Sequence, residues 1–334
     1  MTVPLTFSIV VPTYRRPDRL AACVESLAAL DYPRERFQII VVDDGSGNPP
    51  ESELARVRGH VGVTLVVRPH GGPAAARNTG AAHAQGHYLA FTDDDCMPDR
   101  GWLGALEARF AVVPDHAVGG RTVNALPDNP YSTASQLLVD YFSAWHLERG
   151  DGPFFPSSNL AVPADRFRKL DGFHQGFALA AGEDREFCHR WARAGGRMSY
   201  APEAVVRHAH PLTLRSFWRQ HFIYGCGAFQ FHRLLRSEGR PRANPLSFYL
   251  GLIGCPLHRT QDRRRRLLVG LLALAQAATA AGYSREWLRQ APREPSRRGA
   301  GEGPAGSTPQ PGCSGRKALF RSAKQTAKTG EGFR

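Results

Sequence analysis

Short apolar runs in the first hundred residues alternate with segments whose apolar side chains recur at helical spacing. The runs are rich in Val, Ile and aromatic residues, as expected of buried strands in a parallel sheet. They occupy residues 7–11, 37–43, 63–68 and 87–93. Helical patterns lie between them, at residues 17–30, 51–58 and 73–84. Because strand and helix alternate, the sequence predicts an α/β fold with a doubly wound, mostly parallel sheet.

Beyond residue 100 the pattern is more mixed, and it becomes helical and apolar toward the end. Helices are predicted at residues 101–112, 131–148 and 183–194, and a strand at 197–208. An apolar segment at 267–282 has 16 residues, fewer than the roughly 20 that span a bilayer as a helix. It predicts a helix that lies on a membrane surface or packs in a core. Residues 291–334 are rich in Gly, Pro, Ser and Arg, which predicts disorder.

The charge of the chain divides at about residue 210. Residues 1–210 hold 21 Lys and Arg against 24 Asp and Glu, whereas residues 211–334 hold 22 against 6. A near-neutral body with a basic end indicates a catalytic or binding domain and an appendage for an anionic surface, either membrane or nucleic acid. We expect a first domain at 1–210, a basic helical extension at 211–290 and a disordered basic tail at 291–334.

Cysteine usage and the first residues indicate a cytoplasmic protein. The six cysteines are scattered without a CxxC pair, which argues against a disulfide scaffold or a zinc knuckle and favours reduced thiols. The first twenty residues have neither the basic leader nor the small-residue cleavage site of a signal peptide. We therefore expect folding to begin at the start of this sequence.

Acidic residues follow two of the predicted strands. "VVDDGS" places Asp44 after one strand, and "TDDD" places Asp93, Asp94 and Asp95 after another. Ligands of such sheets bind at the carboxyl ends of the strands, so both groups should lie at one edge. Asp93 and Asp95 share one side of an extended segment, where their carboxylates would suit Mg²⁺ or Mn²⁺ bridged to a diphosphate. Solvated surface carboxylates are the alternative interpretation.

Three other segments carry candidate chemistry. Arg77 lies in the first turns of a predicted helix. One interpretation is a pyrophosphate contact, and the other is an ordinary surface arginine. Glu183 and Asp184 open another helix, where acids are normal, but Asp184 could also act as a general base. His208 ends the strand predicted at 197–208, and His210 follows two residues later. The two interpretations of this pair are a structural role and a metal site.

Five segments in this order resemble a family 2 glycosyltransferase with the A-type nucleotide-sugar-binding fold. The resemblance covers about residues 5–210 and implies an inverting transferase that uses a nucleotide-diphosphate sugar and a divalent cation. The segments are "SIVVPTYRR", "VVDDGS", "GGPAAARNTGAAHAQGHYLAFTDDDCMPDRGWL", "SSNLAVPADRFRKLDGFHQGF" and "GEDREFCHRWARAGGRMSYAPEAVVRHAH".

The resemblance assigns roles residue by residue. Asp95 matches the direct metal ligand and His208 a late metal or phosphate contact, although His210 is close enough to leave that choice open. Asp184 matches the catalytic base. The positions that match donor or nucleotide contacts are Pro12, Tyr14, Asp44, Arg77, Asp93 and Asp94. The positions that match the region of the donor sugar and acceptor are Ser158, Asn159 and Glu183.

Departures from related patterns narrow the function. No Q-x-x-R-W motif follows Asp184, so we expect transfer of a single sugar rather than processive synthesis. The turn after the first strand lacks the glycine fingerprint of a nicotinamide dehydrogenase and the glycine-rich basic loop of a nucleotidyltransferase. The alternative of a different class is an inactive, basic protein that keeps a transferase fold and binds a membrane surface or nucleic acid.

The basic end also predicts where the enzyme works. Arg263 to Arg266 adjoin the apolar segment at 267–282 and would meet anionic headgroups at about 1 kcal/mol per residue. We expect a peripheral protein at the cytoplasmic face of the membrane that acts on a glycan or a lipid-linked acceptor in cell-surface glycan or glycolipid biosynthesis. Nucleic acid is not an expected partner, because no recognised binding module accompanies the charge.

Overall fold

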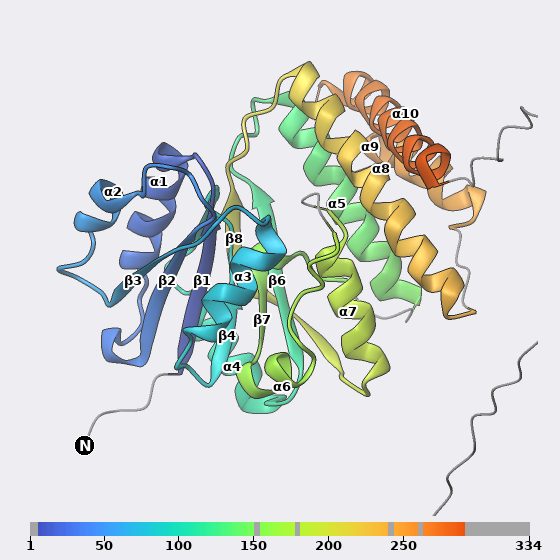
Figure 1. Cartoon of the computed structure of the whole chain (residues 1–334). Coiled ribbons are helices and arrows are strands. Elements are labelled where there is room, and N and C mark those ends of the chain that lie inside the picture. The colour runs from blue at the N-terminus through green and yellow to red at the C-terminus, as the bar shows by residue number, and fades with distance from the viewer. Residues whose placement is uncertain (1–5, 150–153, 178–180, 240–243, 260–262, 291–334) are drawn as a thin grey trace, which may run out of the picture. The chain divides into compact units, whose positions relative to one another are not determined.

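A single eight-stranded sheet forms the centre of the chain (Figure 1). The computed structural model describes residues 6–149, 154–177, 181–239, 244–259 and 263–290. The strand order is β3-β2-β1-β4-β7-β6-β8-β5. The strands are β1 (Phe7–Thr13), β2 (Phe37–Asp43), β3 (Val63–Val67), β4 (Tyr88–Phe91), β5 (Cys96–Pro98), β6 (Ala117–Asn124), β7 (Leu160–Pro163) and β8 (Met198–His208). The predicted disorder of residues 291–334 lies outside the described residues.

The two halves of the sheet differ in strand direction. In the first half β3, β2, β1 and β4 are all parallel, as the repeated strand and helix pattern predicts. In the second half β6 and β8 are parallel, but β7 is antiparallel to both of its neighbours and β5 is antiparallel to β8. The sheet is therefore mixed, and the doubly wound arrangement belongs to its N-terminal half.

Helices cover both faces of the sheet, because successive strand residues point to opposite sides. Ile9 packs with the face that α1 and α4 cover, whereas Val10 packs with the face that α3, α6 and α7 cover. The helices are α1 (Pro17–Ala28), α2 (Glu51–Ala55), α3 (Pro73–Ala82), α4 (Trp102–Val112), α5 (Pro130–Arg149), α6 (Ala164–Lys169), α7 (Glu183–Arg193), α8 (Leu214–Ser237), α9 (Leu246–Arg259) and α10 (Arg265–Gln290). Two short 3₁₀ turns, η1 (Arg34–Arg36) and η2 (Ser157–Asn159), complete the fold.

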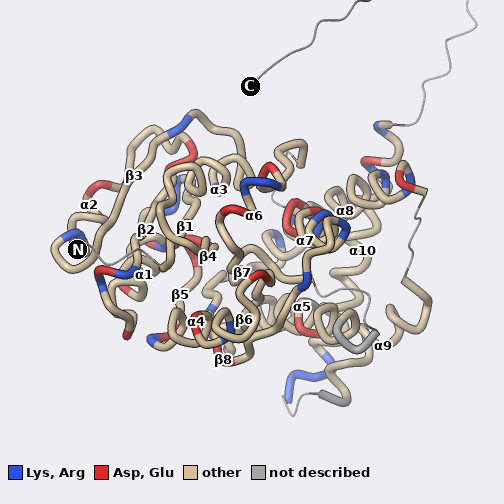
Figure 2. The backbone as a smooth tube through the Cα atoms, turned by 90° about the horizontal axis from the view of Figure 1, so that it is seen from below, with Lys and Arg blue, Asp and Glu red and all other residues tan. Residues whose placement is uncertain are grey.

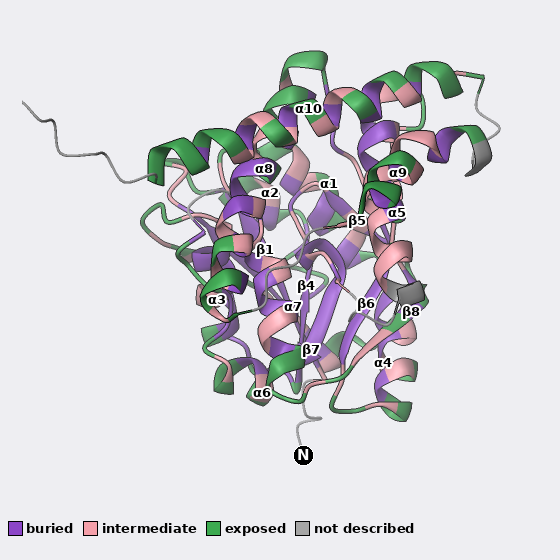
Figure 3. Cartoon of the chain, turned by 90° about the vertical axis from the view of Figure 1, so that its right-hand side faces the viewer, coloured by how far each residue is buried: buried purple, intermediate pink, exposed green. Residues whose placement is uncertain are grey.

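Helices α5, α8, α9 and α10 form a separate layer with an apolar core of its own. Glycines bring α8 and α10 into direct contact, since a Cβ added at Gly225 would lie 2.0 Å from the carbonyl oxygen of Thr279. Figure 3 shows buried and exposed turns alternating along α10. The described residues up to 290 belong to one compact unit, and the domain boundary at residue 210 stays a prediction.

Helix α10 is longer than the apolar segment predicted from the sequence, because it continues in both directions with polar residues. Its 26 residues are long and apolar enough, by length and composition, to cross a membrane. About one third of its most apolar window is nevertheless buried inside the protein. Of the two predicted settings, packing in a core therefore accounts for part of the helix, and its remaining surface is open.

Candidate active site

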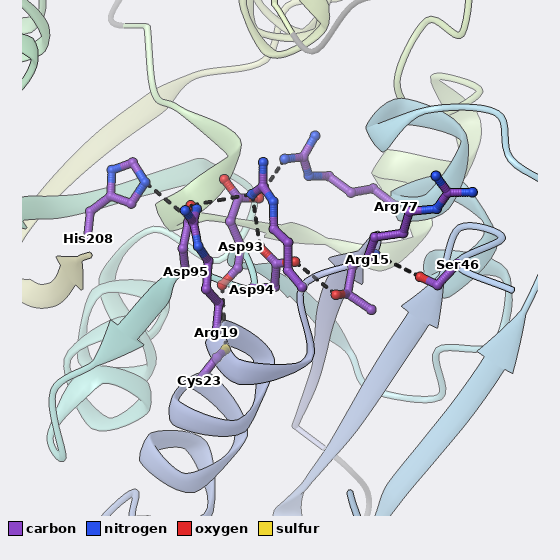
Figure 4. Close-up of polar contacts among 11 residues, drawn as sticks. Arg15, Arg19, Cys23, Ser46, Arg77, Asp93, Asp94, Asp95 and His208 are labelled. Atoms are coloured by element: carbon purple, nitrogen blue, oxygen red, sulfur yellow. Dashed lines mark hydrogen bonds and ion pairs between the residues drawn. The ribbon is translucent and has the colours of Figure 1, made fainter. Parts of the chain in front are cut away.

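The three consecutive aspartates lie at the carboxyl end of β4, in the turn that leads to β5 (Figure 4). The Oγ1 atom of Thr13, the last residue of β1, donates a hydrogen bond to Asp94 Oδ2 at 2.8 Å. Arg77 Nη2 lies 2.6 Å from Asp93 Oδ1. The turn is thus held against β1 on one side and against α3 on the other.

Two arginines at the start of α1 hold the other end of the triplet. Arg16 Nη1 lies 3.3 Å from Asp94 Oδ1 and 3.5 Å from Asp95 Oδ2, and Arg19 Nη1 lies 3.1 Å from Asp95 Oδ2. Sequence reasoning did not assign these arginines to the site, although "YRRPDR" places both at the first turn of the helix. The repulsion among the aspartates is therefore offset by side chains of the same chain.

The adjacent carboxyl groups titrate differently because their surroundings differ. Burial raises the pKa of Asp94 to about 6, with a further contribution from the charge of Asp95. Burial also acts to raise the pKa of Asp95, but the hydrogen bond and charge of His208, together with the nearby arginines, hold it well below its usual range. Asp95 consequently stays ionised to a lower pH than Asp94.

Asp95 and His208 fit a divalent cation. Asp95 Oδ1 lies 3.2 Å from His208 Nε2, whereas the arginines contact the other oxygen, Oδ2. One carboxylate oxygen and one imidazole nitrogen at this separation can bind the same ion. Cys96 Sγ belongs to the same group, but burial raises the pKa of this thiol well above its usual value and keeps it protonated. Asp93 is not a member of this group within the described residues.

A second cluster lies at the carboxyl ends of β1, β2 and β3. The Asp44 carboxylate accepts hydrogen bonds from the backbone N–H groups of Gly71 and Gly72, the latter at 2.7 Å, and pairs with Arg68. The ring of Tyr14 stacks on His70 with 4.3 Å between ring centroids. The predicted residues Tyr14 and Asp44 are thus close together, and an aromatic surface adjoins a carboxylate there.

Pro12 and His70 also lie at this cluster. Pro12 is buried within β1, where it pairs with Val42 of β2, two residues before Tyr14. His70 is exposed, and its Nδ1 atom lies 2.9 Å from Asp44 Oδ2. Sequence reasoning missed His70, because a single histidine in a loop after β3 carries no pattern.

Arg77 joins the acidic turn to the start of α7. Its Nη1 atom lies 3.0 Å from Glu183 Oε1, while Nη2 contacts Asp93. Burial acts to lower the pKa of the Arg77 guanidinium, but the charges of Asp93 and Glu183 more than offset this and hold it above its ordinary value. Arg77 Nε and Glu183 Oε2 are buried and have no partner among the described residues. Orphaned buried polar atoms of this kind mark a place where a ligand can bind.

Asp184 follows Glu183 at the N-terminus of α7. Its Oδ1 atom accepts a hydrogen bond from the Arg185 backbone N–H at 2.8 Å, and Oδ2 lies 3.5 Å from the Ser157 nitrogen. Burial raises the pKa of Asp184, and the negative charge of Glu183 raises it further, while Arg77 opposes both. A carboxylate with a raised pKa beside a ligand site has the properties of a general base.

The two predicted residues of "SSN" differ in their surroundings. Ser158 is buried in η2, next to the residue whose N–H faces Asp184. Asn159 is fully engaged within the protein, because its amide donates to the carbonyl oxygens of Arg121 and Ala204 and accepts from Trp102 Nε1. The geometry therefore gives Asn159 a role in holding η2 against the sheet, and leaves its amide no free donor for a sugar.

Helix α8 contributes residues that sequence reasoning did not assign. Tyr224 is 36% exposed, and the pKa of its hydroxyl is raised by burial, with smaller contributions from the charges of Asp184, Asp95 and Asp93. His221 lies one turn away with a ring centroid 5.5 Å from that of Tyr224. Both nitrogens of His221, and both of His210, are buried without partners among the described residues. The aromatic composition of "FWRQHFIYG" was the available signal, but only the packing orients these rings.

Comparison with known sequences gives consistent matches. The sequence matches the family profile described as "Glycosyl transferase family 2" over residues 8–170 and the one described as "Glycosyl transferase family group 2" over residues 92–282. Pre-mycofactocin glycosyltransferase of Mycobacterium tuberculosis is 33% identical over 227 residues, 66% of this chain and 46% of that protein. Glycosyltransferase AglE of Haloferax volcanii is 27% identical over 274 residues, 79% of this chain and 88% of AglE. The chain thus spans about half the length of the first of these relatives.

Among solved structures, the chain resembles the mannosyltransferase PcManGT from Pyrobaculum calidifontis, which was solved in complex with GDP-Man and Mn²⁺. The TM-score is 0.58 with 20% identity, over 86% of this chain and 89% of that one. At this identity the likeness concerns the fold. It confirms the fold class predicted from the sequence, including a helical extension after β8.

Proposed function

Because the chain belongs to the family 2 glycosyltransferases, we propose that it transfers a single sugar from a nucleotide-diphosphate sugar to a hydroxyl acceptor with inversion. The observation that carries this proposal is the bridge made by Arg77. It joins Asp93 of the acidic turn to Glu183, the neighbour of Asp184. The candidate base and the candidate donor site therefore share one centre.

Inversion needs a single base, because the acceptor hydroxyl attacks C1 of the sugar opposite the leaving diphosphate. Asp184 takes the proton of that hydroxyl, and its raised pKa suits this task near neutral pH. Asp44 and Tyr14 hold the ribose and base, and Arg77 lies on the side of the phosphates. Glu183, paired with Arg77, fixes the first turn of α7 so that Asp184 is correctly placed.

Asp95 and His208 would hold a divalent cation, Mn²⁺ or Mg²⁺, through Oδ1 and Nε2. When bound, such an ion offsets the negative charge that grows on the leaving diphosphate. Arg16 and Arg19 keep Asp95 charged and correctly oriented for this role.

The test measures nucleoside diphosphate release from a panel of UDP-, GDP- and dTDP-sugars, with Mn²⁺, with Mg²⁺ and with a chelator. We expect one donor to be turned over only with metal, and NMR of the product to show the opposite anomeric configuration. Asp184→Asn should lower kcat by about 10² to 10⁴, the usual contribution of a general base. Absence of binding by every donor would refute the proposal and favour an inactive protein with a transferase fold.

We also propose that the enzyme works at the cytoplasmic face of a membrane, through the exposed side of α9. Leu246, Leu250 and Leu257 share one face of this helix and are 72%, 64% and 48% exposed. The opposite face packs into the helical layer through Phe248 and Leu252. Of the basic run Arg263 to Arg266, the first two residues precede α10 and the last two begin it (Figure 2). Apolar and basic side chains together favour anionic lipid, which suits a lipid-linked or surface-glycan acceptor.

Sedimentation with lipid vesicles tests this placement. We expect binding to vesicles that contain anionic lipid, and weaker binding as salt is added. Serine at Leu246, Leu250 and Leu257 together should abolish binding. Serine at Val112, which is exposed on α4 in the sheet domain, serves as the control. Equal binding by the triple variant, or no effect of salt, would contradict the proposal.

A further inference from the structure

Arg185, the residue after the candidate base, has an unusual environment. Its guanidinium carbon lies 5.0 Å from the ring centroid of Phe142 on α5 and 4.6 Å from that of Phe231 on α8. The guanidinium has no ion pair or hydrogen bond among the described residues. By contrast, Arg190 and Arg193 on the same helix pair with Glu186 and Glu238. Arg185 is therefore held by aromatic contacts and by the nearby charge of Asp184, without a direct ion pair.

The aromatic contacts leave the hydrogen-bonding capacity of Arg185 unused. A guanidinium that stacks on rings uses its faces, whereas its five N–H donors point outward in the plane. Burial lowers the pKa of Arg185 to about 10, so the group still carries its charge at neutral pH. A desolvated cation with free donors is unfavourable unless an anion completes the site. Such a planar group is suited to bind a phosphate or a carboxylate through two hydrogen bonds.

The surroundings of Arg185 are apolar and partly open. Phe231 is 5% exposed and forms an apolar cluster with Phe177 and Leu235. Tyr249 of α9 is 39% exposed and lies close enough to Arg185 to affect the pKa of the guanidinium. A ligand can reach this place from solvent and would meet one cation in an apolar setting.

Arg185 also lies on the acceptor side of the centre. It is adjacent to Asp184, which takes the proton of the acceptor hydroxyl, whereas the donor contact Asp44 follows β2 and the donor contact Arg77 lies in α3. In the proposed function Arg77, whose Nε is unpaired, contacts the phosphates of the donor. An anion at Arg185 is therefore part of a second molecule.

We propose that Arg185, between Phe142 and Phe231, binds an acidic group of the acceptor, either a phosphate or a carboxylate. This inference rests on the proposed function, because it is Asp184 that defines the acceptor side. The acceptor would then carry its hydroxyl and its acidic group close together, next to an apolar portion.

Isothermal titration with phenyl phosphate, benzoate and neutral benzyl alcohol tests this site. The protein is first saturated with UDP and GDP in the presence of Mn²⁺, so that the phosphate contacts of the donor are occupied. We expect phenyl phosphate or benzoate to bind and benzyl alcohol to bind at least 10-fold more weakly. The stronger of the two acidic probes identifies the acidic group.

Substitutions then assign the binding to Arg185. Arg185→Gln should weaken binding of the acidic probe at least 10-fold, and Arg185→Lys should retain part of it because the charge remains. The matched control is Arg193→Gln, an exposed arginine of the same helix, which should bind like the unmodified protein. Equal binding by Arg185→Gln, or no preference of the unmodified protein for an acidic probe, would overturn the inference.

The same experiments separate this inference from the proposed function. Donor hydrolysis by the unmodified protein, with water as acceptor, requires no acidic acceptor. Donor hydrolysis without probe binding would overturn the role of Arg185 alone. Probe binding in a protein that turns over no donor would overturn the transferase proposal and leave the anion site.

Discussion

Replacing Arg77 with methionine removes the cation from a buried three-residue bridge. The side chains of Arg77 and Glu183 are 5% and 6% exposed, whereas that of Asp93 is 28% exposed. Removing one partner of a buried ion pair costs about 3–5 kcal/mol, because the other charge stays buried without compensation. Most of this cost falls on Glu183, since water can still reach Asp93. At about 2 °C per kcal/mol for a domain of this size, we expect Tm to fall by about 6–10 °C.

A double-mutant cycle with Glu183→Gln tests the cause of this loss. In the unmodified protein Glu183→Gln removes an ion pair and should destabilise. In the Arg77→Met background it removes an unpaired buried charge, so the same substitution should stabilise. Arg58→Met, which breaks an exposed pair with Glu51, is the control and should change stability by less than about 1 kcal/mol.

Calorimetry of the four proteins at pH 7.5 measures both quantities. If Glu183→Gln has the same sign in both backgrounds, the bridge is not the source of the stability and the reasoning fails. Donor binding is then measured at a temperature where the Arg77→Met protein is folded. Loss of binding would support the proposed contact of Arg77 with the donor phosphates.

Four further predictions concern the site and the helices that pack beside it. Because burial and Glu183 raise the pKa of Asp184 to about 7, protonation below that pH should remove the base, so kcat should fall about tenfold per pH unit; a plateau down to pH 5 would contradict this. Since that pKa lies above the ordinary value of 3.8, the ionised carboxylate destabilises the fold increasingly from about pH 4 to pH 8; the Tm advantage of Asp184→Asn should widen over this range. Asn159→Leu should cost at least about 2 kcal/mol in urea unfolding, because it leaves Trp102 Nε1 and two carbonyl groups unpaired, whereas Ser158→Ala should cost less than half of that. Gly225→Val should separate α8 from α10 and expose residues 265–290 to limited proteolysis, and Gly254→Val, at a glycine with open space around it, should not.

The parallel half of the fold was predictable because its strands carry an uninterrupted apolar signal. β1, β2 and β4 are almost entirely buried, so nearly all of their residues are apolar or small, with Gln38 and Asp43 of β2 as the exceptions. β6 contains two glycines followed by Arg121 and Thr122, and β7 has only four residues. Their direction depends on tertiary partners, which local patterns do not encode.

The candidate site divides in the same way. Asp44, the acidic triplet and Asp184 could be located because strand ends and helix starts fix where a backbone brings them. The contacts of their side chains could not, since Arg16 and Arg19 reach the triplet from the start of α1, which no local pattern relates to the end of β4. Asn159 illustrates the limit, because its place in the chain was identified while its side chain turned inward to Trp102.

Helix α8 makes close backbone contacts on two of its sides. A Cβ at Gly227 would lie 2.3 Å from the carbonyl oxygen of Ala181, just ahead of Glu183, and Gly225 touches α10 on the other side. Because backbone touches backbone at both contacts, α10, α8 and the start of α7 are expected to move together. A force that the surface helices receive from outside the molecule is therefore transmitted to the first turn of α7. A looser attachment of the outer helices would therefore also loosen Asp184, the proposed base.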